Sequence, residues 1–368
     1  MNACSVLLLG VDIVYTGDRA RPSADQGSFK GRSDTIMLAR FAPARNCFFL
    51  LAIPRDTSCE IPGYGRQKIN GANAIGGERL AMRAVAKLTG IHCDHFVVLN
   101  VHGLVELVDA VGGITINVPK KMHYRDKTAG LNIDLSAGPV KLNGTAAMGF
   151  VRFRHDALGD IGRVQRQELF IQALIDKALT PTAWVEVPHL IQIAKRHVKT
   201  DLDMNQIMQV LNFVRQVPKS NQYMMMLPGS FSGTGDWSVD QYGFAKVLQA
   251  ILGRNPAPRP RAQLSIAIEN ASSYPALGRK LSGYLQKLGY QVISVSTHSD
   301  NFASPQAHTR IIAEQGNPQD AALVNHDLHK QAEIVNLSIG DIHSSLTIVA
   351  GDDLIPSLEP SKELAHYH

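Results

Sequence analysis

Between residues 78 and 118, short apolar runs alternate with segments of helical spacing, and this alternation limits the possible folds more than any other feature. Apolar side chains over 78–89 recur as on one face of a helix. Three segments then follow in the order strand, helix, strand, over 96–100, 104–111 and 114–118. Such alternation predicts a layered α/β fold in which helices flank a central mixed sheet.

Other apolar segments extend this pattern along the chain. The run 6–12 is continuous and is closed by Gly10 and Asp12, so we expect a strand that is buried on both faces. A polar loop covers 13–33. We expect further strands at 35–41, 47–53, 148–154 and 224–227, and a further helix at 162–179.

A proline-rich segment divides the chain. Three prolines fall within residues 254–260, which is typical of a stiff inter-domain linker. The total of 368 residues also favours two domains. The predicted organisation is a domain at 1–253 with its core at about 5–180, a linker at 254–261, a small α/β domain at 262–352 and a tail at 353–368.

The composition indicates a folded protein with a sizeable core, since 45% of the residues are hydrophobic and 19% are charged. The formal charge of +5 favours anionic ligands only weakly. The four cysteines lack the spacing of a zinc site, and the sequence allows at most one disulfide in an oxidising compartment, with Cys59 and Cys93 as a candidate pair. No apolar stretch reaches the roughly 18 residues of a membrane span.

Arginines are concentrated between residues 152 and 166, where four occur. On the expected strand Arg152 and Arg154 share one face, and on the following helix Arg163 lies beside Gln167. Arginine forks bind phosphate oxygens in pairs, so their convergence suits a pyrophosphate. The alternative is that these arginines form surface ion pairs with the nearby acids Asp156, Asp160 and Glu168.

Two acids mark a second candidate site. Asp12 ends the first strand, and Asp34 follows Arg32 at the end of the polar loop. Paired carboxylates at strand ends suit Mg²⁺, because this ion prefers oxygen ligands and bridges phosphates. Alternatively, the two carboxylates cap turns.

A third candidate site lies where the 47–53 strand ends. Arg55 follows Pro54 directly, so the backbone is held rigidly as it leaves the sheet, which suits a ligand contact. Lys68 and Asn70 follow, with solvated loop residues as the alternative interpretation. The sequence contains no P-loop, no G-x-G-x-x-G after a strand and no G-x-S-x-G, so nucleotide-type phosphate binding is not expected.

Six separated motifs, taken in order, resemble the LytR-CpsA-Psr (LCP) family. They are Leu8-Leu9-Gly10-Val11-Asp12, Gly31-Arg32-Ser33-Asp34-Thr35, Ile53-Pro54-Arg55-Asp56-Thr57, Lys68-Ile69-Asn70, Val111-Gly112-Gly113-Ile114, and Arg152-Phe153-Arg154 with Arg163, Arg166 and Gln167. This resemblance covers about 5–180, and residues 262–352 resemble the LytR C-terminal domain. Residues 159–167 look closest to the cyanobacterial branch.

The resemblance implies a transferase that moves a glycopolymer from a polyprenyl-pyrophosphate carrier to peptidoglycan. It matches the family's pyrophosphate-binding positions to Arg32, Arg55, Lys68, Arg152, Arg154, Arg163 and Gln167. It matches the acids near Mg²⁺ (or Mn²⁺) to Asp12 and Asp34. In the expected mechanism Arg152 and Arg154 stabilise the leaving phosphate, and Asp34 or Asp156 takes the proton of the acceptor hydroxyl.

The resemblance also implies an extracytoplasmic protein with a membrane anchor ahead of Met1. Two other functions fit the same motifs. One is hydrolysis of the pyrophosphate lipid, with water as the acceptor, and the other is a non-catalytic regulatory or binding role, since the family is also labelled a transcriptional attenuator. Direct nucleic-acid binding is not expected, because no helix-turn-helix is recognisable and the arginines cluster at a strand–helix junction.

Overall fold

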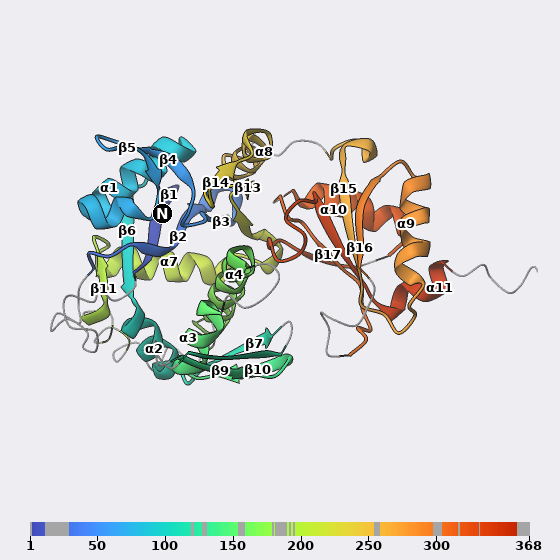
Figure 1. The fold of residues 1–368 in the computed structure, drawn as a ribbon, viewed down its shortest axis with the longest axis horizontal. Helices are drawn as coiled ribbons and strands as arrows, with labels where there is room; N and C mark the ends of the chain where they lie inside the picture. The colour runs from blue at the N-terminus through green and yellow to red at the C-terminus, as the bar shows by residue number, and fades with distance from the viewer. Residues whose placement is uncertain are drawn as a thin grey trace, which may run out of the picture.

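The computed structural model describes residues 2–11, 29–118, 121–126, 131–153, 159–178, 180, 190, 193, 196–253, 258–296, 304–315, 317–330 and 332–358. The chain forms a larger N-terminal region and a smaller C-terminal region, each built on its own sheet (Figure 1). Within these ranges, no helix has the length and apolar character that crossing a membrane requires.

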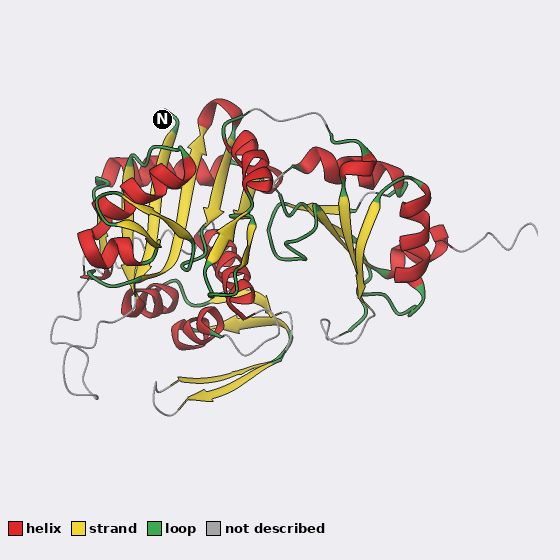
Figure 2. Cartoon of the chain, turned by 45° about the horizontal axis from the view of Figure 1, so that its top comes forward, coloured by secondary structure: helices red, strands yellow, loops and turns green. Residues whose placement is uncertain are grey.

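The larger region is built on a six-stranded mixed sheet. Its strands lie in the order β11 (Val198–Thr200), β6 (His95–Asn100), β1 (Cys4–Val11), β2 (Ser33–Ala42), β3 (Cys47–Ala52) and β12 (Gln222–Met226). Strand β1 pairs antiparallel with β2 and parallel with β6, and β3 pairs parallel with β12. Every residue of β3 is buried, so both faces of the sheet are covered, and Figure 2 shows helices on both sides.

The helices that cover this sheet are α1 (Gly71–Thr89), α7 (Met204–Gln216) and α8 (Gln241–Ile251). The residues that α1 buries include Leu80, Ala84 and Val85, at the helical spacing that the sequence indicated. Helix α1 is broken at Gly76 and Gly77, whose backbone angles are not helical. The layered fold expected from the sequence is therefore confirmed.

A second apolar core lies beside the sheet in the same region. It is formed by α2 (Val101–Ala110), α3 (Gly144–Arg152), α4 (Gly159–Ala178) and the paired strands β7 (Ile114–Val118) with β10 (Gly138–Leu142) and β8 (Met122–Asp126) with β9 (Leu131–Leu135). Two further hairpins are β4 (Ser58–Ile61) with β5 (Gly65–Lys68), and β13 (Gly229–Phe231) with β14 (Trp237–Val239). Short 3₁₀ turns occur at Pro43–Arg45, Lys219–Asn221, Arg261–Gln263 and Asp352–Leu354.

The strand expected at 148–154 is wrong, because residues up to Arg152 belong to helix α3. The side-chain oxygen of Asn143 accepts a hydrogen bond from the backbone N–H of Ala146 at 2.9 Å and so begins the helix. The apolar run that follows is buried nearly all round. A short buried run fits either element, and the cap at Asn143 is the signal that distinguishes them.

The C-terminal region has its own sheet and its own core. The sheet order is β16 (Gln291–Ser296), β15 (Ser265–Asn270), β19 (Leu346–Ala350), β17 (Arg310–Ile312) and β18 (Glu333–Val335), and the helices are α9 (Leu277–Lys287), α10 (Pro318–Asp327) and α11 (Ile355–Leu358). Leu264, Ile266 and Leu281 are fully buried within it. The expected second α/β unit is confirmed, and the two regions lie side by side in both views (Figures 1 and 2).

All four cysteines are free, so the disulfide that the sequence allowed between Cys59 and Cys93 is not formed. Both thiols are buried in the core of the larger region. Burial raises the pKa of Cys59 to about 11 and that of Cys93 to about 12. These thiols therefore serve as small apolar core residues.

Candidate functional site

Three of the sequence motifs meet at one edge of the central sheet, where backbone hydrogen bonds join them. The N–H of Ser33 donates to the carbonyl of Asn70, and the N–H of Asn70 donates to the carbonyl of Arg55, both at 3.2 Å. The N–H of Ile69 donates to the carbonyl of Thr57 at 2.9 Å. The start of β2, the segment after β3 and the end of β5 are thus held in one fixed arrangement.

Side chains at this edge alternate in charge over five residues, which we name the edge chain: Asp34, Arg55, Asp56, Lys68 and Asp236. Arg55 lies 2.6 Å from Asp34 (Nη1 to Oδ1) and 3.3 Å from Asp56 (Nε to Oδ2). The Lys68 Nζ lies 3.0 Å from Asp56 Oδ1 and 3.5 Å from Asp236 Oδ1. The hydrogen bond to Asp56 is the main cause that raises the pKa of Lys68. Both cations are therefore held at defined positions, yet remain partly open to solvent.

The edge chain decides between the interpretations that the sequence left open. Asp34 lies within β2 and accepts a hydrogen bond from Arg55, so it does not cap a turn. Lys68 ends β5 and is bonded to Asp56, so it is not a solvated loop residue. Sequence reasoning missed Asp56 as a site residue, although it adjoins Arg55. It also missed Asp236, which belongs to a Ser- and Gly-rich turn that only the tertiary fold brings to Lys68.

Arg32 is exposed, just ahead of β2. The buried Asn73 of α1 fixes the backbone there, because its Nδ2 donates to the carbonyls of Phe29 and Gly31 at 2.9 and 2.8 Å. A side-chain amide therefore sets the position from which Arg32 projects. Asn73 is a further residue whose role the sequence did not reveal.

Helix α4 brings Arg163 to the same edge. Arg163 is 3% exposed, and with Arg55 and Asp56 it lines a small pocket that also includes Phe231 and Trp237. Gln167, one turn further along α4, is also buried. Arg55 and Arg163 therefore come to the same place from two elements, whereas the sequence predicts that Arg163 converges with Arg152 and Arg154.

The other arginines of the cluster differ from expectation. Arg166 is buried, donates from Nη2 to the carbonyl of Phe153 and lies over its ring, so it ties α4 to the segment after α3. Arg163 and Arg166 are therefore buried and do not lie on the protein surface. Arg152 is half-buried in the last turn of α3, and its expected shared face with Arg154 was derived from a strand that is a helix. Arg154, Asp156 and Asp12 lie outside the described residues.

The donor atoms at the edge suit a hard cation. In the part of the chain that the structure describes, no group of three or more His, Cys, Asp or Glu side chains is placed to hold a metal ion. Mg²⁺ typically binds through one or two protein carboxylates together with substrate phosphates, so a larger cluster is not needed. One oxygen of Asp34 is bound to Arg55, which leaves the other for a cation. Asp34 thus has the right chemistry for one ligand of such a site.

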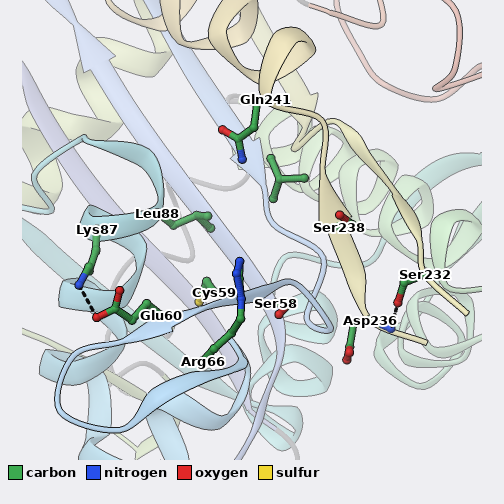
Figure 3. A pocket seen from close by; sticks show the side chains of 11 residues that line it. Ser58, Cys59, Glu60, Arg66, Lys87, Leu88, Ser232, Asp236, Ser238 and Gln241 are labelled. Carbon is green, nitrogen blue, oxygen red and sulfur yellow. Dashed lines mark hydrogen bonds and ion pairs between the residues drawn. The ribbon is translucent and has the colours of Figure 1, made fainter. Parts of the chain in front are cut away.

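A polar cleft of about 530 Å³ opens next to the edge chain (Figure 3). Asp236 lines one side of it, and an ion pair between Lys87 Nζ and Glu60 Oε1, at 2.6 Å, lies on the opposite side. Arg66 projects between them, and the remaining polar lining is provided by Ser58, Ser232, Ser238 and Gln241. Hydroxyl, amide and guanidinium groups arranged in this way suit a ligand that is rich in hydroxyls.

Comparison with known proteins identifies the family. Residues 1–252 match the LytR_cpsA_psr family, and residues 263–354 match the domain described as LytR cell envelope-related transcriptional attenuator. The first match extends over more than half of the sequence. This chain therefore belongs to the LytR_cpsA_psr (LCP) family.

Several relatives carry the name polyisoprenyl-teichoic acid–peptidoglycan teichoic acid transferase TagU. The protein of Oceanobacillus iheyensis is 33% identical over 217 residues, which are 57% of this chain and 62% of that protein. The protein of Enterococcus faecalis is 33% identical over 251 residues, 67% of this chain and 78% of that protein. This chain thus spans less than two thirds of the first relative's length. The solved structure of TagT bound to LI-WTA is 25% identical with a TM-score of 0.53, over 68% of this chain and 91% of that chain.

Proposed function

We propose that this chain is a phosphotransferase of the cell envelope that moves a glycopolymer from a polyprenyl-pyrophosphate carrier to peptidoglycan. The observation that carries the proposal is that Arg55, after β3, and Arg163, on α4, come from two elements to the same place beside the edge chain, because guanidinium groups from two elements suit a diphosphate. The name of the TagU relatives and the TagT structure with bound LI-WTA support the same class of reaction. An enzyme that acts on peptidoglycan works outside the cytoplasmic membrane.

In the proposed reaction a hydroxyl oxygen of peptidoglycan attacks the phosphorus that carries the glycopolymer. The bond from this phosphorus to the bridging oxygen breaks, a phosphodiester forms and polyprenyl monophosphate leaves. Arg55 and Arg163, with Arg32, Lys68, Arg152, Arg154 and Gln167, would hold the diphosphate and stabilise the charge on the leaving phosphate. The hydroxyl proton passes to a carboxylate, Asp34 or Asp156.

Asp12 and Asp34 are the residues that would hold Mg²⁺ or Mn²⁺, which supplies further positive charge next to the diphosphate oxygens. Arg55 binds one oxygen of Asp34, so a cation and a transferred proton would compete for the other. Asp156 is therefore the better proton acceptor whenever the cation is on Asp34.

We place the acceptor sugar in the polar cleft. Asp236 lines the cleft and also belongs to the edge chain, so a ligand in the cleft lies beside the diphosphate site. The serine hydroxyls, Gln241 and Arg66 are suitable partners for sugar hydroxyls. This placement gives the donor and the acceptor separate, adjoining sites.

The test is a reconstituted reaction with a synthetic polyprenyl-pyrophosphate oligosaccharide, peptidoglycan fragments and Mg²⁺, analysed by mass spectrometry. We expect a phosphodiester-linked conjugate together with polyprenyl monophosphate, and a loss of both when the cation is chelated. Free oligosaccharide phosphate without conjugate would instead identify a hydrolase. If the chain neither binds nor converts the lipid, the regulatory or binding role replaces the transferase.

A further inference from the structure

A short segment of the C-terminal region covers β12, an outermost strand of the central sheet. This docking segment, Asn336–Ile342, follows β18. The N–H of Met224 donates to the carbonyl of Asn336, and the N–H of Met226 donates to the hydroxyl of Ser338, both at 2.9 Å. Both methionines belong to β12, which is the last strand of the sheet. Leu337 and Ile342 also pack against the core of the N-terminal region, so the two regions share an apolar contact.

The docking segment also holds helix α4. The N–H of Ser338 donates to Glu168 Oε2 at 3.0 Å, and Gln165 Nε2 donates to the carbonyl of Gly340 at 2.8 Å. Gln165 and Glu168 lie on the same stretch of α4 as Arg163 and Gln167. The contact is therefore made within about one helical turn of the residues assigned to the diphosphate.

The surroundings of these hydrogen bonds are dry. Glu168 has no exposed surface, and the hydroxyl of Ser338 donates onward to the carbonyl of Glu314, which is also buried. Burial raises the pKa of Glu168 to about 8 and that of Glu314 well above its ordinary value. Hydrogen bonds are stronger in such surroundings, and a buried polar group that loses its partner is costly. The buried hydrogen bonds between the docking segment and α4 thus favour one defined position of α4.

We propose that the docking segment is a positioning element of the diphosphate site. Through Gln165 and Glu168 it fixes α4, and it thereby sets Arg163 at the distance from Arg55 that a diphosphate requires. Gln165 and Glu168 are positioning residues, since they act through α4 and do not contact the lipid. This inference rests on the proposed function, and it gives the C-terminal domain a direct influence on substrate binding.

The test compares full-length variants with geranylgeranyl pyrophosphate as the probe. Gln165→Ala combined with Glu168→Ala removes both side-chain contacts that α4 makes with the docking segment. Ser338→Ala removes the hydroxyl that accepts from the N–H of Met226 on β12. The matched control is Gln172→Ala, because Gln172 bonds Asp176 within α4 at 3.2 Å. Hydrogen exchange of the Met224 and Met226 amides reports docking, calorimetry reports affinity, and circular dichroism confirms the fold.

We expect the double variant to exchange faster at both amides and to bind the probe about fivefold more weakly or worse, with Ser338→Ala changed in the same direction. The control should match the wild type. Glu168→Gln alone should keep docking and affinity close to those of the wild type, because its amide oxygen still accepts from the N–H of Ser338. Faster exchange with unchanged affinity for the probe would overturn the positioning role of the docking segment and would leave the proposed function standing. A wild type that binds no diphosphate lipid would overturn the proposed function, and the inference with it.

Discussion

The edge chain and the domain junction, where the docking segment contacts α4, use acidic side chains in opposite ways. At the edge, Asp34 and Asp56 each face a cation and stay partly exposed. At the junction, Glu168 is fully buried and bonds the backbone N–H of Ser338. Exposed ion pairs contribute little to stability, and their cations can turn to a stronger anion. A buried neutral carboxyl contributes structure and no charge. The difference separates the part of the site that binds from the part that holds it in place.

Removal of the central cation of the edge chain should have the largest effect. Arg55→Ala leaves Asp34 and Asp56 facing the diphosphate without the guanidinium, and we expect transfer to fall about 100-fold or more. Arg55→Lys keeps the charge but loses the fork, so its loss should be smaller. Rates of conjugate formation measure this, with Arg83→Ala on the exposed face of α1 as control. Equal losses in Arg55→Ala and Arg83→Ala would contradict the role of the edge chain.

Glu168, at the domain junction, should make the free energy of unfolding depend on pH. The pKa of Glu168 is raised from 4.5 to about 8, so its contribution is fully present below pH 4.5 and is lost as the pH rises toward about 8. The buried Glu314 is close to Glu168 and Glu269, and the charges of these two acids raise its pKa further. Its contribution to stability should therefore also be lost as the pH rises.

The matched variant for this pH effect is Glu168→Gln, which cannot ionise. Relative to it, the free energy of unfolding of the wild type should fall with a slope of up to about 1.4 kcal/mol per pH unit in that window. Urea unfolding at several pH values measures the slope. Parallel curves for the two proteins would show that Glu168 is ionised in the folded state.

A substitution in the polar cleft should weaken binding of the acceptor and leave binding of the lipid unaffected. Arg66→Ala removes a cation that lines the cleft, and we expect the KM for peptidoglycan fragments to rise about tenfold with little change in the affinity for geranylgeranyl pyrophosphate. Steady-state kinetics and calorimetry separate the two. A weaker lipid affinity with an unchanged acceptor KM would assign Arg66 to the donor site.

The smallest effect is expected from the exposed pair at the far side of the cleft. Lys87 and Glu60 are both about half exposed, so Lys87→Ala should change the free energy of unfolding by at most about 0.5 kcal/mol. Thermal unfolding beside Glu168→Ala provides the comparison. A larger loss for Lys87→Ala than for Glu168→Ala would reverse the contrast between exposed and buried charges.

Local patterns predicted those parts of the molecule that local physics determines. Strand β3 and the buried face of α1 follow from apolar runs and their spacing, and Arg55 was found because Pro54 ends a buried strand. The run at 148–154 was misassigned, because burial on all sides removes the periodicity that separates a helix from a strand.

The remaining features depend on contacts between distant segments. Asp236 meets Lys68 only through the tertiary fold, and Ser338 meets Glu168 across 170 positions of the chain. Neither residue stands in a motif that marks such a partner. The sequence therefore supplied Asp34 and the cations of the edge chain, and the structure supplied Asp56, Asp236 and the support for α4.

The contact between the docking segment and β12 also determines what happens when the C-terminal region is removed. Met224, Met225 and Met226 are almost fully buried, and two of their amides are satisfied only by the C-terminal region. A fragment that stops at residue 253 would present an apolar strand with open N–H groups to solvent. Such edges pair with other copies of themselves. In the whole chain the C-terminal domain covers this strand edge, so we expect a fragment that ends at residue 253 to associate more readily than the whole chain.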